Sequence, residues 1–301
     1  MKELERYVPG MEGPIWYEHW HRYHFAAPFA TGRIVADAAC GEGYGCALLA
    51  RHAARVTGID ASEDATALAR RRYGGSASLE FRTGRCERLP LEDASVDLLV
   101  SFETLEHLAE PRAFISEAAR VVRREGLFMV STPNKVVYTD QSGYHNEFHP
   151  SEMYQSEFVA ALNERFAAVT LFAQRVDAYS AIWPLERAAR SAQLVQARAA
   201  DGGDAAPGIA DPMYFIALCA ADEATLDRSP VAFSLLSDRE HRVCGNYERA
   251  QADIAVMQAQ VKRLEAEYIR AQQQLAALLQ ERDRTAAPAA SSAPPREWPR
   301  R

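Results

Sequence analysis

Short apolar runs alternate with amphipathic segments between residues 33 and 220. The runs predict strands at 33–39, 55–60, 78–83, 96–102, 126–132, 168–174 and 213–220, and the segments between them predict helices at 44–53, 62–73, 111–124 and 156–163. In Val96–Phe102 and Leu127–Val130 the apolar residues are nearly continuous, which is typical of parallel strands covered on both faces. We therefore expect an α/β protein with a seven-stranded, doubly wound Rossmann-like sheet.

A different apolar period occupies the C-terminal part of the chain. Its positions are spaced alternately three and four residues apart: Tyr247, Ala250, Ile254, Met257, Val261, Leu264, Tyr268, Ala271, Leu275 and Leu278. This heptad spacing predicts a coiled coil over 246–284 and a homo-oligomer formed through it. The alternative is a single amphipathic helix packed on its own domain. Tyrosines at two a positions and alanines at two d positions leave the number of strands open, and the composition of 285–301 predicts a disordered tail.

Three further segments flank or interrupt the α/β pattern. Residues 1–32 are expected to form an N-terminal helical cap, and residues 221–245 a connector to the coiled coil. Between the last two predicted strands lies an insertion, 177–212, with a helical portion around 185–199. It is either a lid over the substrate or a plain surface excursion.

A glycine-rich turn after the first predicted strand indicates a nucleoside-cofactor site. Gly41, Gly43 and Gly45 allow a ligand to approach the backbone, and Asp60, at the end of the next strand, can accept hydrogen bonds from a ribose diol. The glycine spacing differs from the G-x-G-x-x-G of dinucleotide folds. Asp37 and Glu42 place carboxylates where a pyrophosphate would be repelled and a cationic sulfonium or ammonium group tolerated. The pattern therefore favours S-adenosylmethionine over NAD.

The stretch Val35–Gly43 resembles the first motif of class I S-adenosylmethionine-dependent methyltransferases, and the likeness extends over about residues 1 to 220. It implies that 33–220 form the methyltransferase domain and that the final strand of the sheet is antiparallel. We assign Asp37, Gly41, Gly43, Asp60 and Ala61 to cofactor binding. Ala39 stands where the family has its first glycine, and it fits if its backbone keeps an ordinary conformation.

Two later segments also resemble motifs of this family. Arg82–Pro90 resembles the adenine-binding turn, but Arg85 stands where an acceptor aspartate is common, and arginine cannot accept a hydrogen bond. We expect backbone atoms of Cys86 or the carboxylate of Glu87 to bind the adenine, with Arg85 stacked or pointing away. Ser101–Leu108 resembles the fourth motif of methyltransferases that act on sugars, lipids and quinone precursors, which places Glu103 near the methionyl end of the cofactor.

Histidines near these motifs are the candidate catalytic residues. His107 could take the proton from a substrate hydroxyl because imidazole titrates near neutral pH; the alternative is that it only shapes the pocket. His149, in the polar and aromatic loop after residue 133, is the second candidate. We assign no metal ligands, although His145 and His149, with Glu106 and His107, could hold a divalent ion.

The aromatic and basic segment Pro14–His24 precedes the first strand. In the family a helix at this place closes over cofactor and substrate. Arg22 is the candidate partner of a carboxylate or phosphate, and Tyr17 or Tyr23 is the candidate for packing against the sulfonium.

Charge and cysteine content narrow the possible classes. A formal charge of −7 on 301 residues disfavours a nucleic-acid-binding protein. Five cysteines without C-x-x-C spacing argue against a disulfide framework or a zinc module and imply a reducing compartment. The N-terminus is too charged for a signal sequence, and no apolar run is long enough for a membrane span. We expect a cytoplasmic protein that can be recruited to the inner face of the cell membrane through a glycan-assembly partner.

The combined features resemble bacterial O-antigen and surface-polysaccharide methyltransferases. This resemblance implies an O-methyltransferase whose acceptor is a sugar hydroxyl or a terminal sugar phosphate. Two alternatives remain: a methyltransferase for a small metabolite or quinone precursor, and a non-catalytic coiled-coil assembly protein. The sequence leaves the acceptor and the methylated position open.

Overall fold

The computed structural model describes residues 7–9, 11, 13–176, 180–185, 195–196, 206–207, 211–226, 230, 233–236 and 242–285. The chain divides into two compact units, Met1–Val243 and Cys244–Arg301. No described helix combines the length and the apolar character that a membrane span requires.

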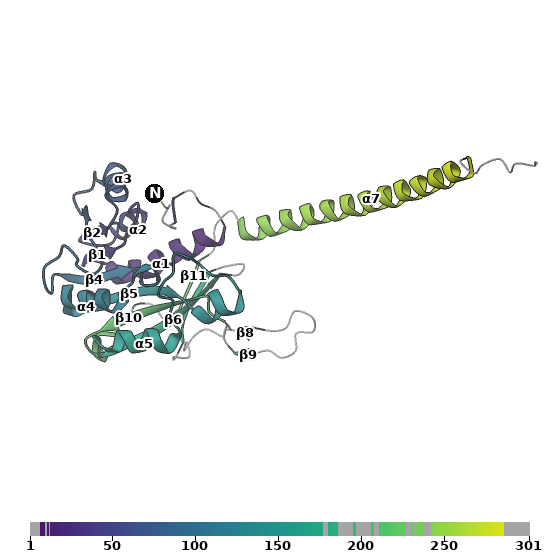
Figure 1. The fold of residues 1–301 in the computed structure, drawn as a ribbon. Helices are drawn as coiled ribbons and strands as arrows, with labels where there is room; N and C mark the ends of the chain where they lie inside the picture. The colour runs from purple at the N-terminus through teal and green to yellow at the C-terminus, as the bar shows by residue number, and fades with distance from the viewer. Residues whose placement is uncertain are drawn as a thin grey trace, which may run out of the picture. The chain divides into compact units, whose positions relative to one another are not determined.

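The first unit is built on one mixed sheet (Figure 1). Its strands are β1 (Ile34–Ala38), β2 (Arg55–Asp60), β3 (Leu79–Thr83), β4 (Val96–Ser101), β5 (Val122–Pro133), β6 (Ala168–Val176), β7 (Ser180–Pro184), β10 (Tyr214–Ala220) and β11 (Ser234–Leu236), in the spatial order β11-β7-β6-β10-β5-β4-β1-β2-β3. Strands β1 to β5 pair in parallel, and β10 is antiparallel to both β5 and β6, as the resemblance implied.

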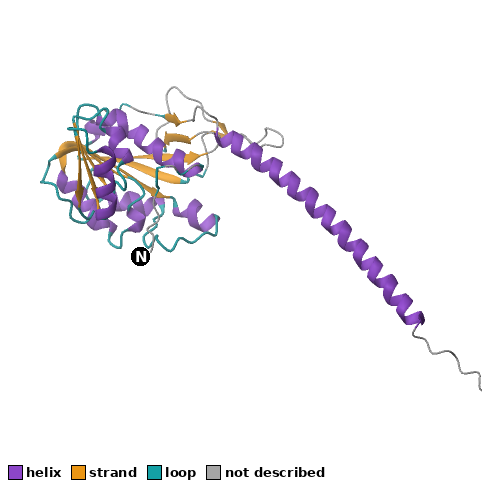
Figure 2. Cartoon of the chain, turned by 90° about the horizontal axis from the view of Figure 1, so that it is seen from above, coloured by secondary structure: helices purple, strands orange, loops and turns teal. Residues whose placement is uncertain are grey.

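Helices cover both faces of this sheet (Figure 2). They are α1 (Pro14–Ala30), α2 (Tyr44–Leu49), α3 (Glu63–Tyr73), α4 (Pro111–Val121), α5 (Gln155–Asn163) and α6 (Glu223–Leu226), with a 3₁₀ turn η1 (Leu105–His107) and a π-helical segment η2 (Val136–Gln141). One apolar cluster packs α1 and α2 against the sheet through residues such as Phe25 and Leu49, and a second packs α4 and α5 through Phe114 and Phe158. The sheet is therefore buried on both sides, which explains its continuous apolar strands.

The sheet has nine strands, so the prediction of seven was incomplete. The additional strands β7 and β11 pair antiparallel with each other, and β7 also pairs with β6. Buried His21 of α1 joins them, because its Nδ1 lies 2.7 Å from Ser180 Oγ in β7 and its Nε2 lies 2.9 Å from Ser234 Oγ in β11. These short strands are held by a contact distant in sequence, which a local apolar pattern does not reveal.

The insertion also differs from its prediction. Strand β7 lies inside it, and β8 (Val195–Gln196) pairs with β9 (Ala206–Pro207). Residues 195–196 are therefore in a strand, whereas a helix was expected there. The other residues of the predicted helical portion, apart from Leu185, lie outside the described part of the chain, and so does the predicted tail beyond Thr285. The connector contains α6 and β11 rather than only irregular chain.

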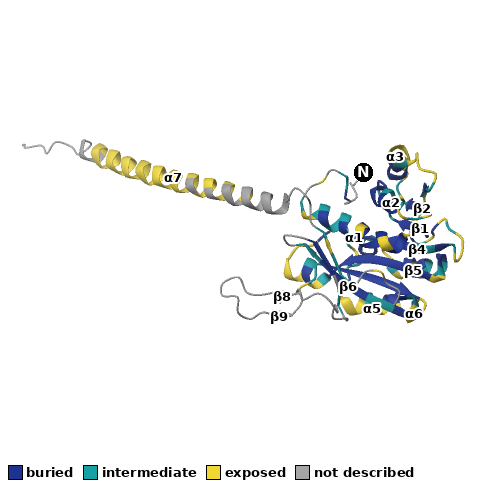
Figure 3. Cartoon of the chain, turned by 180° about the vertical axis from the view of Figure 1, so that it is seen from behind, coloured by how far each residue is buried: buried dark blue, intermediate teal, exposed yellow. Residues whose placement is uncertain are grey.

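In the second unit the structure describes one helix, α7 (Arg242–Thr285). Its described side chains are exposed along its length (Figure 3). The exposed set includes large apolar residues at the predicted heptad positions: Ile254, Met257, Val261, Leu264, Tyr268, Leu275 and Leu278.

Candidate active site

The turn after β1 passes the chain through left-handed conformations at Gly41 (φ 55°) and Gly43 (φ 81°). A side chain at position 43 would meet the Phe81 ring at 2.6 Å, whereas one at position 41 would meet nothing within 4 Å. Glycine is therefore required by packing at position 43, while position 41 borders open space. This open space at the carboxyl end of β1 is where a doubly wound sheet binds its ligand.

Ala39 does not keep an ordinary backbone conformation, contrary to the expectation. Its φ of 62° lies in the left-handed region, which costs a residue with a Cβ roughly 1–2 kcal/mol. The turn therefore keeps the geometry that a glycine would give it, with strain stored at Ala39.

Asp60, at the end of β2, fixes the glycine-rich turn after β1, Gly41–Gly45, which is the cofactor turn. Its Oδ2 accepts from the Gly41 backbone N–H at 2.8 Å, and its Oδ1 accepts from the Ser62 N–H at 2.8 Å. Each carboxylate oxygen has a second lone pair, so the half-buried Asp60 can also accept from a ribose diol. Ala61 is exposed beside it, and Ser62 caps α3 by accepting from Ala65 N–H.

Asp37 is the most unusual acid of the site because it is fully buried in β1. Its Oδ2 accepts from Tyr23 Oη at 3.0 Å and from Cys46 Sγ at 3.1 Å, while Oδ1 has no partner among the described residues. Burial raises the pKa of Asp37 to about 7, although the hydrogen bonds from Cys46 and Tyr23 act to lower it. An unpaired buried acid beside this turn fits a cationic ligand.

The predicted adenine-binding residues lie in the turn after β3. Arg85 is exposed, and its Nη2 donates to Glu87 Oε1 at 3.0 Å. Cys86 is buried in the cluster beneath α4 and α5. Arg85 thus points to solvent and holds the Glu87 carboxylate.

Glu103 lies two residues beyond the end of β4 and is held in a strained conformation with φ 52°. Its backbone N–H donates to Ser131 Oγ at 3.0 Å, and that hydroxyl donates to Glu103 Oε1 at 2.6 Å. The neighbouring Thr132 hydroxyl donates to Glu106 Oε2 at 3.3 Å. The end of β5 therefore holds two carboxylates side by side, and such strain is typical of functional positions.

Arg22 of α1 reaches the same region and is fully buried. Its Nη2 lies 3.5 Å from Glu103 Oε1, its Nε donates to Gln174 Oε1 at 2.8 Å, and its guanidinium lies 4.4 Å from the ring centre of Tyr214. Both Nη atoms have no hydrogen-bond partner among the described residues. The ion pair with Glu103 raises the pKa of Arg22 against the opposing effect of burial.

The two candidate tyrosines of α1 occupy different places. The Tyr23 ring packs so closely over the cofactor turn that a side chain at Gly45 would overlap it. Tyr17 is buried and packs edge-on against Trp16. Of the two, Tyr23 is the residue that the structure brings to the cofactor turn.

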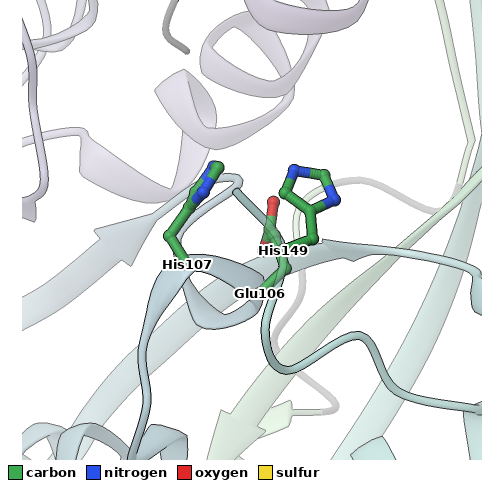
Figure 4. A group of neighbouring side chains, drawn as sticks. All are labelled: Glu106, His107 and His149. Carbon is green, nitrogen blue, oxygen red and sulfur yellow. The ribbon is translucent and has the colours of Figure 1, made fainter. Parts of the chain in front are cut away.

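Glu106, His107 and His149 form a cluster of side chains (Figure 4). One ligand atom from each residue lies within 4.8 Å of the others. The His107 and His149 rings pack edge to face, with 4.7 Å between the ring centres. Burial and the charge of Glu103 raise the pKa of Glu106 well above its usual range. His145 is exposed and is not part of this cluster.

Several residues around the site carried no signal in the sequence. Gln174 and Tyr214 come from the adjacent antiparallel strands β6 and β10, where they are paired in register. Glu152 lies three residues after His149 in the same loop, and its Oε1 is 2.9 Å from His149 Nδ1. Only the sheet order brings Gln174 and Tyr214 to Arg22, so no local motif could have identified them.

Comparison with known proteins finds methyltransferases that are similar to this chain. Residues 36–130 match the family model described as a methyltransferase domain. A probable S-adenosylmethionine-dependent methyltransferase from Mycolicibacterium smegmatis is 40% identical over 161 residues, which cover 52% of this chain and 62% of that protein. The YcgJ protein of Bacillus subtilis has the same fold, with a TM-score of 0.50 at 17% identity over 68% of this chain and 100% of that one.

A more distant relative is a ubiquinone biosynthesis O-methyltransferase from Bartonella tribocorum. It is 32% identical over 109 residues, which cover 36% of this chain and 44% of that protein. The chain therefore spans less than two thirds of the length of either curated relative.

Residues 36–130 are therefore similar to a methyltransferase domain, and the named relative is a probable S-adenosylmethionine-dependent enzyme. The carboxylates around the turn favour the same cofactor. Among named proteins, the chain is similar to the mycobacterial methyltransferase over half of its own length.

Proposed function

We propose that the protein transfers the methyl group of S-adenosylmethionine to an acceptor oxygen at the carboxyl ends of β4 and β5. The observation that carries this proposal is the set of carboxylates at or just beyond the carboxyl ends of the neighbouring strands β1, β2 and β4: Asp37, Asp60 and Glu103. They match the donors of a ribose diol and of a methionyl ammonium group and would repel the phosphates of a dinucleotide.

The chain's own residues would divide the binding work. Asp60 accepts from ribose hydroxyls, Asp37 Oδ1 accepts from the ammonium group, and Glu103 lies at the reacting end. Backbone atoms of Cys86 and the Glu87 side chain face the adenine. The cofactor supplies an electrophilic methyl group, and the protein contributes mainly alignment and exclusion of water.

The acceptor would lie against His107 and His149, next to Glu103. Their rings present polar edges for a hydroxyl group, and Tyr138, whose ring centre is 5.4 Å from that of His149, gives the same pocket an aromatic wall. A sugar hydroxyl or a terminal sugar phosphate of a surface glycan fits this combination. In the glycan case Arg22, with its unpartnered Nη atoms, is the candidate contact for a phosphate.

A second acceptor class has its own support. The relative from Bartonella tribocorum is named for ubiquinone biosynthesis, and a quinone precursor is a phenol that would stack on an aromatic wall. We therefore carry a small aromatic acceptor as the alternative to the glycan.

We also propose that α7 forms a coiled coil between copies of this chain. Side chains at its a and d positions are largely exposed, for example Leu264 at 64% and Leu278 at 63%. An uninterrupted heptad stripe of such residues is the pattern of a helix that pairs with a like helix. This assembly would serve recruitment to a glycan-assembly partner.

Labelled S-adenosylmethionine tests the proposal directly. The full-length protein would be incubated with fractionated cell-envelope glycans and, separately, with polyprenylated catechols. Label in the glycan fraction supports the first acceptor class, and label in the catechol supports the second. Tight cofactor binding with no transfer to any fraction would favour a non-catalytic assembly protein.

A further inference from the structure

We propose that Glu106, His107 and His149 bind a divalent first-row transition-metal ion that holds the acceptor oxygen. This inference rests on the proposed function for the role of the ion but not for its binding. The sequence assigned no metal ligand but allowed Glu106, His107, His145 and His149 to hold a divalent ion, and the structure brings three of these four residues together.

The ligand atoms of the three side chains lie near one another (Figure 4). Their ligand atoms lie within 4.8 Å of one another, and a two-histidine, one-carboxylate set leaves coordination positions open for an exogenous oxygen. Ligand atoms about 2.1 Å from a tetrahedral ion lie roughly 3.4 Å apart. The three ligand atoms, now within 4.8 Å of one another, would therefore approach each other by at most about 1.4 Å when an ion binds.

Glu106 has one carboxylate oxygen without a hydrogen-bond partner among the described residues. Glu106 is buried, and its Oε2 accepts from Thr132, but its Oε1 has no hydrogen-bond partner among the residues that the structure describes. A buried carboxylate oxygen without a donor is costly unless a cation satisfies it. A metal ion at the cluster would supply that missing partner.

Both imidazole rings are oriented by an acceptor next to their Nδ1 atoms. His107 Nδ1 lies 2.9 Å from the carbonyl oxygen of Phe148, and His149 Nδ1 lies 2.9 Å from Glu152 Oε1. Because both partners are acceptors, Nδ1 carries the proton in each ring and the lone pair lies on Nε2. Metal-ligating histidines are held in this way by a carbonyl or a carboxylate behind them.

One contact must change when the ion binds. His149 Nε2 lies 3.1 Å from Asn146 Nδ2, an amide nitrogen that can only donate. That contact confirms a lone pair on Nε2, and the ion would replace the amide as its partner.

The charge of the surroundings also favours a cation. Glu103 adjoins Glu106, and half-buried Glu18 lies near enough to both Arg22 and Glu103 to interact with them electrostatically. Among the described residues, Arg22 is the cation that interacts with all three acids, so three carboxyl groups share one guanidinium. A doubly charged ion would give these carboxyl groups a second cationic partner.

The donor set indicates which ions fit. Two imidazole nitrogens and one carboxylate suit Zn²⁺, Mn²⁺, Fe²⁺ or Co²⁺, whereas Mg²⁺ and Ca²⁺ prefer oxygen ligands. In the proposed reaction the ion binds the acceptor hydroxyl and eases loss of its proton to water. The oxygen then forms a bond to the methyl carbon as the sulfur–methyl bond breaks, and that bond's electron pair stays on sulfur.

The test is a titration of tag-free, chelator-treated full-length protein with Co²⁺, followed by its visible absorption bands. The variants are Glu106→Gln, His107→Ala and His149→Ala. The matched control is His145→Ala, which removes an exposed histidine of the same loop. Calorimetric binding of S-adenosylhomocysteine reports whether each variant keeps its folded cofactor site.

We expect one equivalent of Co²⁺ for the wild type and for His145→Ala, and at least tenfold weaker binding for each of the three cluster variants. Glu152→Ala should weaken binding tenfold or more, because it removes the acceptor behind His149. S-adenosylhomocysteine affinity should stay within threefold throughout.

Two results would overturn the metal site: no stoichiometric Co²⁺ binding by the wild type, or equal losses in His145→Ala and the cluster variants. Failure of the methyltransferase proposal would look different, since the wild type would then bind Co²⁺ but not S-adenosylhomocysteine.

Discussion

At the scale of single residues, the cofactor turn concentrates groups that are unfavourable for stability alone. Asp37 is an unpaired buried acid, and Ala39 and Glu103 have left-handed backbones. Such features persist when the surrounding structure holds them in place and when a ligand uses them. The motif identified Asp37, Gly41 and Asp60 from sequence, but it did not reveal that Ala39 is strained, because backbone angles depend on packing of the whole turn.

Asp37 makes folding stability depend on pH. Its pKa is about 7 in the folded protein and near 3.8 when exposed, so the folded state keeps a proton that the unfolded state has lost between these values. The stability of the cofactor-free protein should therefore fall as pH rises from about 4 through 7, by on the order of 4 kcal/mol from this group alone.

Asp37→Asn should remove that loss, because the amide does not ionise. Thermal unfolding at pH 5.5 and pH 8 should show a higher Tm at pH 8 for the variant than for the wild type, while its affinity for S-adenosylmethionine falls at least tenfold. A variant that is destabilised at pH 8 and binds the cofactor normally would contradict both roles.

Ala39→Gly should relieve strain. Glycine adopts φ 62° without the penalty of a Cβ, although it gains entropy in the unfolded chain. We expect a net stabilisation of about 0.5–1 kcal/mol, measured by urea unfolding. Ala38→Gly, in the adjacent strand residue, is the control and should destabilise.

At the scale of elements, the apolar pattern was sufficient for the long central strands and insufficient for the short edge strands. In β4 and in the second half of β5, Leu127–Val130, the apolar residues are nearly continuous and buried, so their local sequence determines them. The first half of β5, with Arg123, Arg124 and Glu125, was expected to end a helix and to precede the strand. Strands β7 and β11 depend on the pairing with β6 and on hydrogen bonds to His21, which no local pattern contains. Gln174 and Tyr214 likewise reach the site only through the pairing of β6 with β10, so their local sequence does not predict their place.

His21 should therefore be a structural histidine. Burial lowers its pKa to about 3, so protonation opposes folding, and this stability is lost as pH falls from about 6.5 toward 3. His21→Ala leaves two serine hydroxyls without their partner and should cost roughly 2–3 kcal/mol in chemical denaturation. His24→Ala, at an exposed position of the same helix, should change stability by less than about 0.5 kcal/mol. Equal effects of the two would refute the role of His21.

At the scale of the whole molecule, the sheet order places the end of β1 between those of β2 and β4. This topological switch point explains why motifs far apart in sequence meet at one edge of the sheet. The sequence could therefore locate the cofactor side of the site, while the acceptor side, built on loops and antiparallel strands, needed the structure. The four cysteines whose side chains the structure describes, Cys40, Cys46, Cys86 and Cys219, are buried free thiols.

The proposed coiled coil has a test of its own. Leu264→Asp places a charge at the centre of the exposed heptad stripe and should convert the oligomer to monomer in sedimentation analysis. Arg270→Asp, outside the stripe on the same helix, should leave the assembly intact. If the wild type sediments as a monomer at micromolar concentration, the helix has another role.

The most direct test of the account is calorimetric titration of the wild type and of Asp60→Ala with S-adenosylmethionine, S-adenosylhomocysteine and NAD. The account predicts one site of micromolar affinity for the two adenosyl sulfur compounds, a loss of at least tenfold in Asp60→Ala, and no heat with NAD. Binding of NAD in place of S-adenosylmethionine would contradict it.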